Sequence, residues 1–334
     1  MTALRPSKVG TYLYMLKLLL PMIFVFAESK GCPWIAFKAG GQDGFGGEVL
    51  ARVGLMVAAH SKGFGYCHSP FYHLHHVGGS EDRLEKYMNL SGAASLLFGS
   101  VEICSAAHSS VLLGEGLVPR RKIACSKEKP VICFCSKTHI CSHILSQNPS
   151  QILPLLPSLR ASRERELPHR KVKSREKEIA IHIRRGDAPK ERVLTNEKIQ
   201  AIIGFLKAKY EQEAVDINFH LYSQGTESDF RQMVGEQKIY LHLSAPTVPC
   251  RYGSRGMAKH EKCTNHTVSS VVTDDLIRTL DALITSEVLV IANSAFSYVA
   301  GIYNEGTVYY IHDKRGPFVG GRKPLRSWIP IKLS

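Results

Sequence analysis

The sequence predicts an α/β protein whose C-terminal half forms a parallel, doubly wound sheet. From residue 178 onward, short apolar segments with strand-like alternation and segments with helical periodicity follow one another about five times. Three of the strands end in polar or small residues, at the edge where ligands bind in such sheets. The chain has 334 residues, 44% of them hydrophobic, so it is long enough for two domains and is not a disordered chain.

The elements of this half can be assigned in order. We expect strands at 179–183, 217–222, 239–243, 288–292 and 307–311, and helices at 196–210, 229–234, 273–285 and from the serines after residue 292 to 303. Because each strand is separated from the next by a helix, neighbouring strands run parallel.

The N-terminal half begins with a similar unit. A short strand at 34–37 leads into the glycine-rich loop 40–47, and a helix over 48–63 ends at a glycine. A strand is expected at 64–68 and another at 129–135, while the rest of 91–159 is less regular. Glycines free backbone amides at the start of a helix, so Gly41 and Gly44 are predicted ligand contacts, the alternative being a simple tight turn.

Residues 1–30 are predicted to be a signal peptide or a signal-anchor. Arg5 and Lys8 precede the apolar stretch TYLYMLKLLLPMIFVFA, a pattern typical of export leaders, although a buried helix is the alternative. We therefore expect a location in the secretory pathway, in the Golgi or endoplasmic reticulum lumen, with a possible type II membrane anchor. The sequons at Asn89 and Asn265 agree with this route.

The remaining boundaries follow from composition. Residues 31–159 form a predicted acceptor-side α/β domain, 160–177 a basic linker, and 178–334 a nucleotide-binding domain.

The nine cysteines favour disulfides over metal in an exported chain, with Cys250 and Cys263 as a plausible pair. The histidine-rich segment 71–76 lacks a carboxylate or cysteine at suitable spacing, so no metal site is expected.

The net charge of +14 favours an anionic partner, namely nucleic acid, a membrane surface or a phosphorylated small molecule. The basic run 160–177 contains no aromatic residue, which a surface for single-stranded nucleic acid would need. We therefore expect no nucleic-acid partner, and a polyanion-binding protein is kept as a distant alternative.

Three strand ends carry the residues that indicate an anion site. Arg184 and Arg185 directly follow the strand 179–183, where a guanidinium fork matches phosphate oxygens. Ser294 and Ser297 stand at a helix start, where amides bind anions, although either serine could be only an N-cap. The strand 217–222 also ends in polar groups, at Tyr222 and Ser223. Together these ends predict a pocket for an anionic nucleotide.

The sequence lacks the motifs of three common kinds of nucleotide site. The sequence contains no G-x-x-x-x-G-K-[ST], no G-x-G-x-x-G after a strand, and no D-x-D run for a divalent metal. The two arginines can take the place of that metal, because they neutralise charge on a departing diphosphate.

The segment His182-Ile183-Arg184-Arg185-Gly186-Asp187 resembles the H-x-R-R-x-D motif of the α1,2-, α1,6- and protein O-fucosyltransferase superfamily. The segment 293–297 (NSAFS) resembles the late S-x-F-S motif of that superfamily, and the loop 41–47 resembles its glycine-rich loop. The resemblance spans about 34–310, with the motifs in the expected order.

This resemblance implies a GT-B-like fold, in which two Rossmann-like domains face each other across a cleft. It implies an inverting glycosyltransferase that needs no metal and transfers fucose from GDP-fucose to a glycan or protein hydroxyl. Arg184 would hold the β-phosphate, and His182 would lie near the guanine or ribose. Asp187 would orient the arginines, and Ser294, Phe296 and Ser297 would line the nucleotide site.

Two roles are less well defined by the resemblance. An acidic residue that reads guanine is expected before the S-x-F-S motif, with Asp274, Asp275 and Asp281 as candidates, of which Asp281 enters the predicted site. Asp187 and Glu191 are the candidates for the general base.

Three further hypotheses remain. The scaffold could use another nucleotide sugar, the chain could be a non-catalytic relative, or the RGD at 185–187 could be an adhesive ligand.

Overall fold

The computed structural model describes residues 34–38, 43–63, 65–71, 74, 81–99, 131–135, 145, 149–163, 176–185, 193–213, 216–233, 238–244, 266–312 and 323–333. For the strands 34–38 and 131–135 and for residues 266–274, only the backbone is described. The predicted leader at 1–30 lies outside these residues.

The N-terminal part is a small parallel sheet with helices packed beside it. Strand β1 (Trp34–Lys38) pairs with β2 (Gly65–Tyr66) and with β3 (Val131–Cys135), both in parallel. Helix α2 (Phe45–Lys62) follows β1 and ends at Gly63, whose left-handed φ of 66° suits glycine. The other helices are α3 (Glu81–Met88), α4 (Leu90–Phe98), the 3₁₀ helix η3 (Pro149–Leu155) and α6 (Leu156–Ser162).

The C-terminal part is a six-stranded parallel sheet. Its strands are β4 (Glu176–Ile183), β5 (Asp216–Gln224), β6 (Ile239–Ser244), β7 (Val288–Ile291), β8 (Thr307–His312) and β9 (Ile329–Lys332). The order across the sheet is β6-β5-β4-β7-β8-β9, and every neighbouring pair is parallel. The order therefore runs outward in both directions from β4 and β7, so the switch point where ligands bind lies between these two strands.

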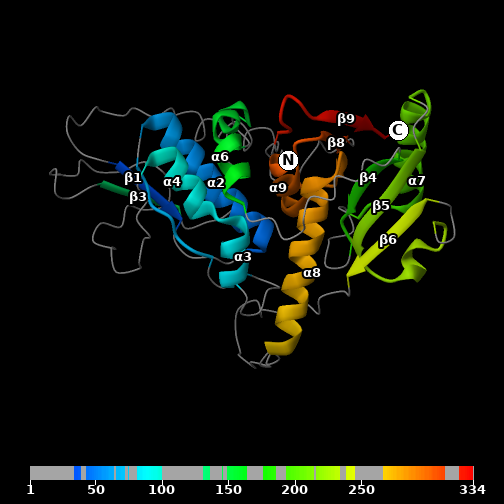
Figure 1. Cartoon of the computed structure of the whole chain (residues 1–334), viewed down its shortest axis with the longest axis horizontal. Helices are drawn as coiled ribbons and strands as arrows, with labels where there is room; N and C mark the ends of the chain where they lie inside the picture. The colour runs from blue at the N-terminus through cyan, green and yellow to red at the C-terminus, as the bar shows by residue number, and fades with distance from the viewer. Residues whose placement is uncertain are drawn as a thin grey trace, which may run out of the picture.

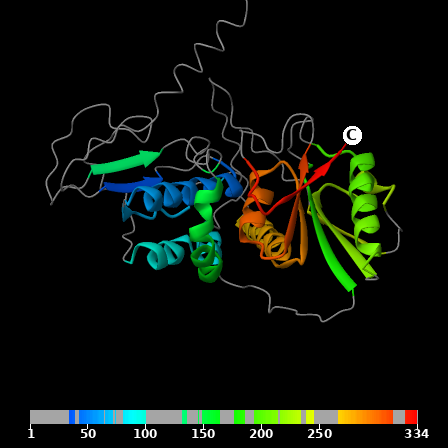
Figure 2. The same ribbon diagram turned by 90° about the horizontal axis from the view of Figure 1, so that it is seen from above.

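Helices cover both faces of this sheet. Helix α7 (Asn196–Glu211) lies on one face, and α8 (His266–Thr285) and α9 (Ala295–Tyr303) lie on the other, between the sheet and the N-terminal helices (Figures 1 and 2). The core under α7 contains Ile181 and Ile183, whereas Ala180 and Leu289 face the core that includes α8 and α9. That second core continues into α2, so apolar packing joins the two parts.

The predicted α/β class and parallel sheet are confirmed, with boundaries that differ by a few residues. The expected helix 229–234 is instead the 3₁₀ helix η5 (Glu227–Phe230), and α8 begins seven residues earlier than expected. Helices α3 and α4 lie in or beside a region without a predicted element, and β9, which contains Pro330, was not predicted. The cleft between two domains stays a prediction.

Among the described helices, none combines the length and the apolar character that a membrane span requires.

Candidate functional site

The residues of the two predicted motifs lie on the strands that flank the switch point. His182 belongs to the end of β4, and Ser294 to Ser297 follow β7 at the start of α9. β4 and β7 are hydrogen-bonded neighbours, with Ile181 opposite Val290. Segments about 115 residues apart are therefore brought to one edge of the sheet.

His182 contacts α9 directly. A hydrogen bond joins its Nδ1 to Ser297 Oγ, and its ring lies 5.4 Å from that of Phe296. His182 is 8% exposed and Ser297 is fully buried. Burial, with a further contribution from the charge of Arg184, lowers the pKa of His182 to about 3. The imidazole is therefore neutral at physiological pH, and it keeps one ring N–H to donate.

Two helix N-termini meet beside this histidine. Ser294 occupies the N-cap position of α9 but makes no capping hydrogen bond with its side chain, and the same is true of Gly44 at the start of α2. A Cβ on Gly46 would lie 2.5 Å from the backbone nitrogen of Phe296, so the first turns of α2 and α9 are in close contact. The amides of both first turns carry partial positive charge. At α2 the Asp43 carboxylate already lies against the first turn, whereas at α9 this charge favours an anionic ligand.

Neither serine acts as a side-chain cap of α9. Ser294 stands at the N-cap position without the bond that would define a cap, and Ser297 bonds to His182 instead. The side chain of Asp43 is in contact with the turn, because its Oδ1 accepts a hydrogen bond from the Gly44 amide at 2.8 Å.

The two arginines differ in their surroundings. Arg184 is partly exposed, and its charge acts on His182. The guanidinium of Arg185 donates to the carbonyl oxygens of Asp229 at 2.7 Å and Leu194 at 3.2 Å, and it lies 4.1 Å from the Phe230 ring centroid. Arg185 thus faces the α7 side and holds two loops together, which also leaves it poorly placed as an adhesive side chain.

The end of β5 is less open than the sequence suggests. Ser223 is buried, and its hydroxyl donates to the carbonyl of Gln224 at 3.0 Å. Tyr222 lies beside His182 in the strand register, and its ring stacks on His242 with centroids 4.4 Å apart. Burial, together with the charge of Glu178, raises the pKa of Tyr222 to about 12, so the phenol stays protonated.

Asp281, predicted to read guanine, lies in a buried ion pair. This residue is 1% exposed, and its carboxylate pairs with the Arg163 guanidinium and accepts a hydrogen bond from Tyr87 Oη at 3.0 Å. It lies inside the contact between α8 and the N-terminal helices, and its role in reading guanine stays a prediction. Asp275 is exposed, and the side chain of Asp274 is outside the description.

Several predicted positions lie outside the described residues: Gly41, Asp187 and Glu191, the histidines at 73, 75 and 76, the sequon at Asn265, and Cys250 and Cys263. In the described part of the chain, no three His, Cys, Asp or Glu side chains gather as a metal site would require. At the other sequon, the Asn89 side chain caps α4, and its Nδ2 donates to the Ser162 carbonyl at 2.9 Å.

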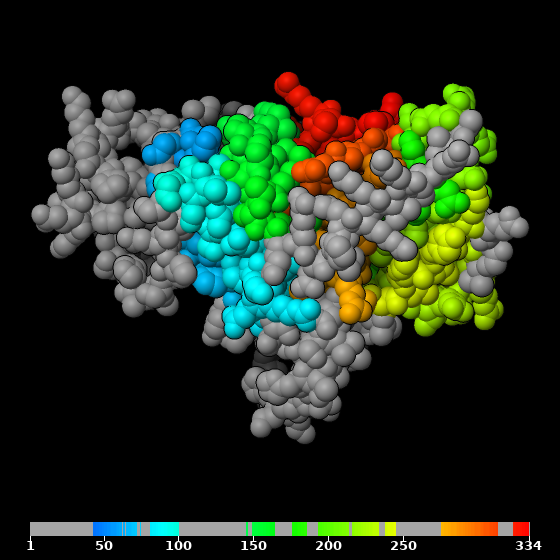
Figure 3. All heavy atoms as spheres, viewed as in Figure 1, coloured from blue at the N-terminus to red at the C-terminus, as the bar shows by residue number. Residues whose placement is uncertain are grey.

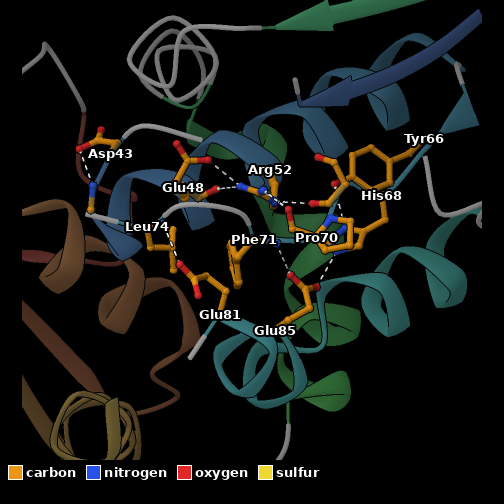
Figure 4. Close-up of polar contacts among 12 residues, drawn as sticks. Asp43, Glu48, Arg52, Tyr66, His68, Pro70, Phe71, Leu74, Glu81 and Glu85 are labelled. Atoms are coloured by element: carbon orange, nitrogen blue, oxygen red, sulfur yellow. Dashed lines mark hydrogen bonds and ion pairs between the residues drawn. The ribbon is translucent and has the colours of Figure 1, made fainter. Parts of the chain in front are cut away.

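Sequence reasoning missed a buried polar network next to the glycine-rich loop (Figure 4). Glu48 and Arg52, one helical turn apart on α2, form an ion pair of 2.8 Å at 0% and 1% side-chain exposure. Arg52 also donates to the carbonyls of Ser69 and Pro70, both at 2.7 Å. A charged i, i+4 pair within an otherwise apolar helix is the signal that could have revealed it.

A second pair fixes the same segment. His68 Nε2 lies 2.5 Å from Glu85 Oε1, and Glu85 Oε2 accepts a hydrogen bond from the Phe71 amide at 2.9 Å. Burial opposes ionisation of Glu85, but the hydrogen bond and charge of His68 outweigh it and lower the pKa of the carboxyl. Residues 68–71 are therefore held between Arg52 of α2 and Glu85 of α3.

No protein-family model matches the chain, and no curated protein matches it significantly. Several solved structures are similar at low identity. The Bradyrhizobium NodZ α-1,6-fucosyltransferase soaked with GDP-fucose is 11% identical, with a TM-score of 0.39 over 82% of this chain and 93% of that one. The E. coli heptosyltransferase WaaC with an ADP-fluoroheptose is 9% identical, with a TM-score of 0.38 over 90% and 93%.

An Arabidopsis thaliana FUT1 variant in complex with GDP is 11% identical, with a TM-score of 0.37 over 96% of this chain and 77% of that one. TM-scores below 0.5 at such identities do not establish a family. The proposed function therefore depends on the residues of this chain.

Proposed function

We propose that the chain is a glycosyltransferase that transfers fucose from GDP-fucose to a hydroxyl group of a glycan or a protein. The observation that carries the proposal is the contact of His182 with Ser297 and Phe296 at the switch point, beside Arg184 and two helix N-termini without side-chain caps. It unites the two motifs that resemble the fucosyltransferase superfamily. Arg184 and the N-terminus of α9 also bring positive charge to this edge, which suits a nucleoside diphosphate.

In the proposed reaction, the diphosphate binds at the start of α9 and receives hydrogen bonds from backbone amides and Arg184. The acceptor oxygen forms its bond to the anomeric carbon while the bond to the β-phosphate oxygen breaks, so the configuration inverts. The negative charge that develops on the departing GDP is stabilised by the guanidinium and the helix N-terminus, the role that a metal plays elsewhere. His182, neutral and held by Ser297, offers a ring N–H to the nucleotide.

The acceptor proton needs a base, and Asp187 and Glu191 remain the candidates for it. The leader and the sequon at Asn265 support the proposal that the protein works in the lumen of the Golgi or endoplasmic reticulum, with or without a membrane anchor.

The test is a calorimetric titration of the purified chain with GDP, UDP and ADP in the presence of EDTA. We expect selective binding of GDP. Arg184→Ala should weaken it by about 10–150-fold, the effect of losing a hydrogen bond to a charged group worth about 1.5–3 kcal/mol, and should abolish transfer. Arg278→Ala, which removes an exposed arginine on α8, is the matched control and should bind GDP like the wild type.

The outcomes separate the alternatives. Tighter binding of UDP or ADP would indicate another nucleotide sugar, and GDP binding without any transfer would indicate a non-catalytic relative. A folded sample that binds none of the three would refute the proposed donor site.

A further inference from the structure

The large sheet has two edge strands, and only one of them is protected against pairing with another chain. β9, at one edge, is four residues long and contains Pro330 and Lys332. Natural sheets use these residue types to block an edge, because proline lacks an N–H group and the charge of lysine is costly to bury. β6, at the other edge, has the sequence IYLHLS, without a proline, a glycine, an acidic residue, a lysine or an arginine.

β6 is also more exposed than its apolar composition suggests. None of its six residues is buried, Tyr240 is 48% exposed, and the three odd-numbered residues Ile239, Leu241 and Leu243 are only partly buried against the core under α7. Among the described residues, no strand pairs with its outer edge, and β6 forms a margin of the sheet in Figure 1. An apolar edge strand of this kind is a template for another strand.

The backbone of β6 presents alternate residues to such a strand. The carbonyl of Lys238 accepts a hydrogen bond from the amide of Phe219 at 2.8 Å, and the carbonyl of Ser244 accepts one from the amide of Gly225 at 3.2 Å. The even-numbered residues therefore direct their backbone groups to β5. Because successive residues of a strand direct these groups to opposite sides, the N–H and C=O groups of the three odd-numbered residues point away from the sheet.

The side chains of β6 form a pattern that is symmetric about Leu241. Apolar residues at 239, 241 and 243 alternate with the rings of Tyr240 and His242. When two copies of β6 pair in antiparallel about this centre, Ile239 lies opposite Leu243 of the second copy, and Tyr240 lies opposite its His242. A two-fold axis requires such self-complementarity, because the same surface meets itself.

The backbone agrees with the same register. In an antiparallel pair, residues whose N–H and C=O groups face the partner lie opposite one another and exchange both hydrogen bonds. Centring the pair on Leu241 places the three outward-facing residues of each copy opposite those of the other. Like charges do not meet, since Lys238, which pairs with Asp216 at 2.6 Å, lies opposite Ser244 of the second copy.

The rings of β6 are already ordered for this contact. Tyr240 stacks on His220 with ring centroids 5.0 Å apart, and His242 stacks on Tyr222 at 4.4 Å. The rings therefore stand side by side on one face of the sheet, and cross-strand aromatic pairs with the second copy would extend the row.

We infer that β6 pairs in antiparallel with β6 of a second copy of this chain, so that two six-stranded sheets join into one. The inference is independent of the proposed function. Because β5 and β4 separate β6 from the switch point, the pairing leaves the proposed donor site open in both copies.

Sedimentation velocity of the full chain tests the association. An interface built around one pair of strands is small, so a dissociation constant in the micromolar range is expected, and the measurement covers about 1–100 µM. The average mass should rise with concentration from that of one chain to that of two.

Amide hydrogen exchange, read at single residues at both ends of this concentration range, tests the geometry. The amides of Ile239, Leu241 and Leu243 should exchange several-fold more slowly at the high concentration, because they are hydrogen-bonded only in the dimer. The amides of Tyr240 and His242 bond to β5 and should be slow at both concentrations.

Two variants test the strand itself. Tyr240→Lys changes an exposed side chain and should leave the chain monomeric over this range, because it gives β6 the protection that Lys332 gives β9. Leu241→Pro removes the outward N–H at the centre of the pair and should have the same effect. Ile329→Lys is the matched control, since it makes the same change at a 38% exposed residue of β9 and should dimerise like the wild type.

Circular dichroism checks the fold of each variant, and Tyr240→Lys decides the outcome if Leu241→Pro does not fold. A chain that stays monomeric throughout would overturn the inference and leave the edge of β6 to a strand of another protein. It would be overturned equally if Tyr240→Lys associated like the wild type, which is the result expected if the apolar leader or another surface held the copies together. Unchanged exchange at the odd-numbered amides of an associated chain would also overturn it.

Discussion

The substitution Asp281→Leu tests whether this aspartate stabilises the contact between the two parts of the chain instead of binding the nucleotide. Its carboxylate is 1% exposed and pairs with Arg163, whose side chain is 5% exposed, so the substitution leaves a guanidinium buried without its counter-charge. Breaking a buried pair from one side costs about 3–5 kcal/mol. At about 2 °C per kcal/mol for a chain of this size, the melting temperature should fall by about 6–10 °C.

The double variant Asp281→Leu/Arg163→Met removes both charges and should recover most of the loss, because a buried pair can be replaced by apolar groups at little cost. Thermal and urea unfolding of the wild type, both single variants and the double variant form the cycle. Asp281→Asn, which is close to isosteric, should retain the wild-type affinity for GDP. An Asp281→Asn protein with normal stability but without GDP binding would refute the structural role and restore the guanine role.

Three further predictions concern single side chains. Burial and the charge of Arg184 lower the pKa of His182 from 6.5 to about 3, so below pH 6.5 the unfolded chain takes up a proton that the folded protein does not. The free energy of unfolding should therefore fall by about 2 kcal/mol as the pH is lowered from 6.5 to 5. Urea unfolding should show a smaller pH dependence in His182→Asn. Gly46→Ala should destabilise the protein and weaken GDP binding, since its Cβ would meet the backbone of Phe296, whereas Gly204→Ala, with open space around it, should be neutral or stabilising on urea unfolding. Asn89→Ala should lower the unfolding free energy by about 1 kcal/mol through loss of the α4 cap. Because the wild-type Asn89 side chain is engaged in this cap, mass spectrometry of the secreted wild-type protein should find no glycan on Asn89.

The strands of the large sheet could be predicted because local signals and tertiary packing agree there. The apolar run around Ile181 is buried on both faces by helices, which is the environment that such runs indicate. β9 was missed because it is a four-residue edge strand with a proline, and such a strand depends on β8 for its pairing. α3 was missed because most of its residues are polar, and only Leu84, Tyr87 and Met88 face the core.

The site was predictable only where residue chemistry and strand position coincide. His182 and Ser297 follow from the motifs and from the rule about strand ends, and the structure brings them into contact. The separate environments of Arg184 and Arg185 were not predictable, since adjacent residues after a strand can face opposite sides of the sheet. The buried contacts of Asp281 were not predictable, because sequence spacing does not reveal that one turn of α8 faces Tyr87 and Arg163 from distant segments.

The apolar core that contains α2, α8 and α9 has a practical consequence for experiments on parts of this chain. In the space-filling view, helices from the first hundred residues, α6 and the C-terminal segments form one continuous surface (Figure 3). Residues of this core come from both parts, including Val49 and Leu50 of α2 and Tyr298 and Ile302 of α9. A fragment that begins at β4 would leave one face of α9 in water, and expression of the C-terminal half alone should yield aggregated material until the missing helices are supplied in trans.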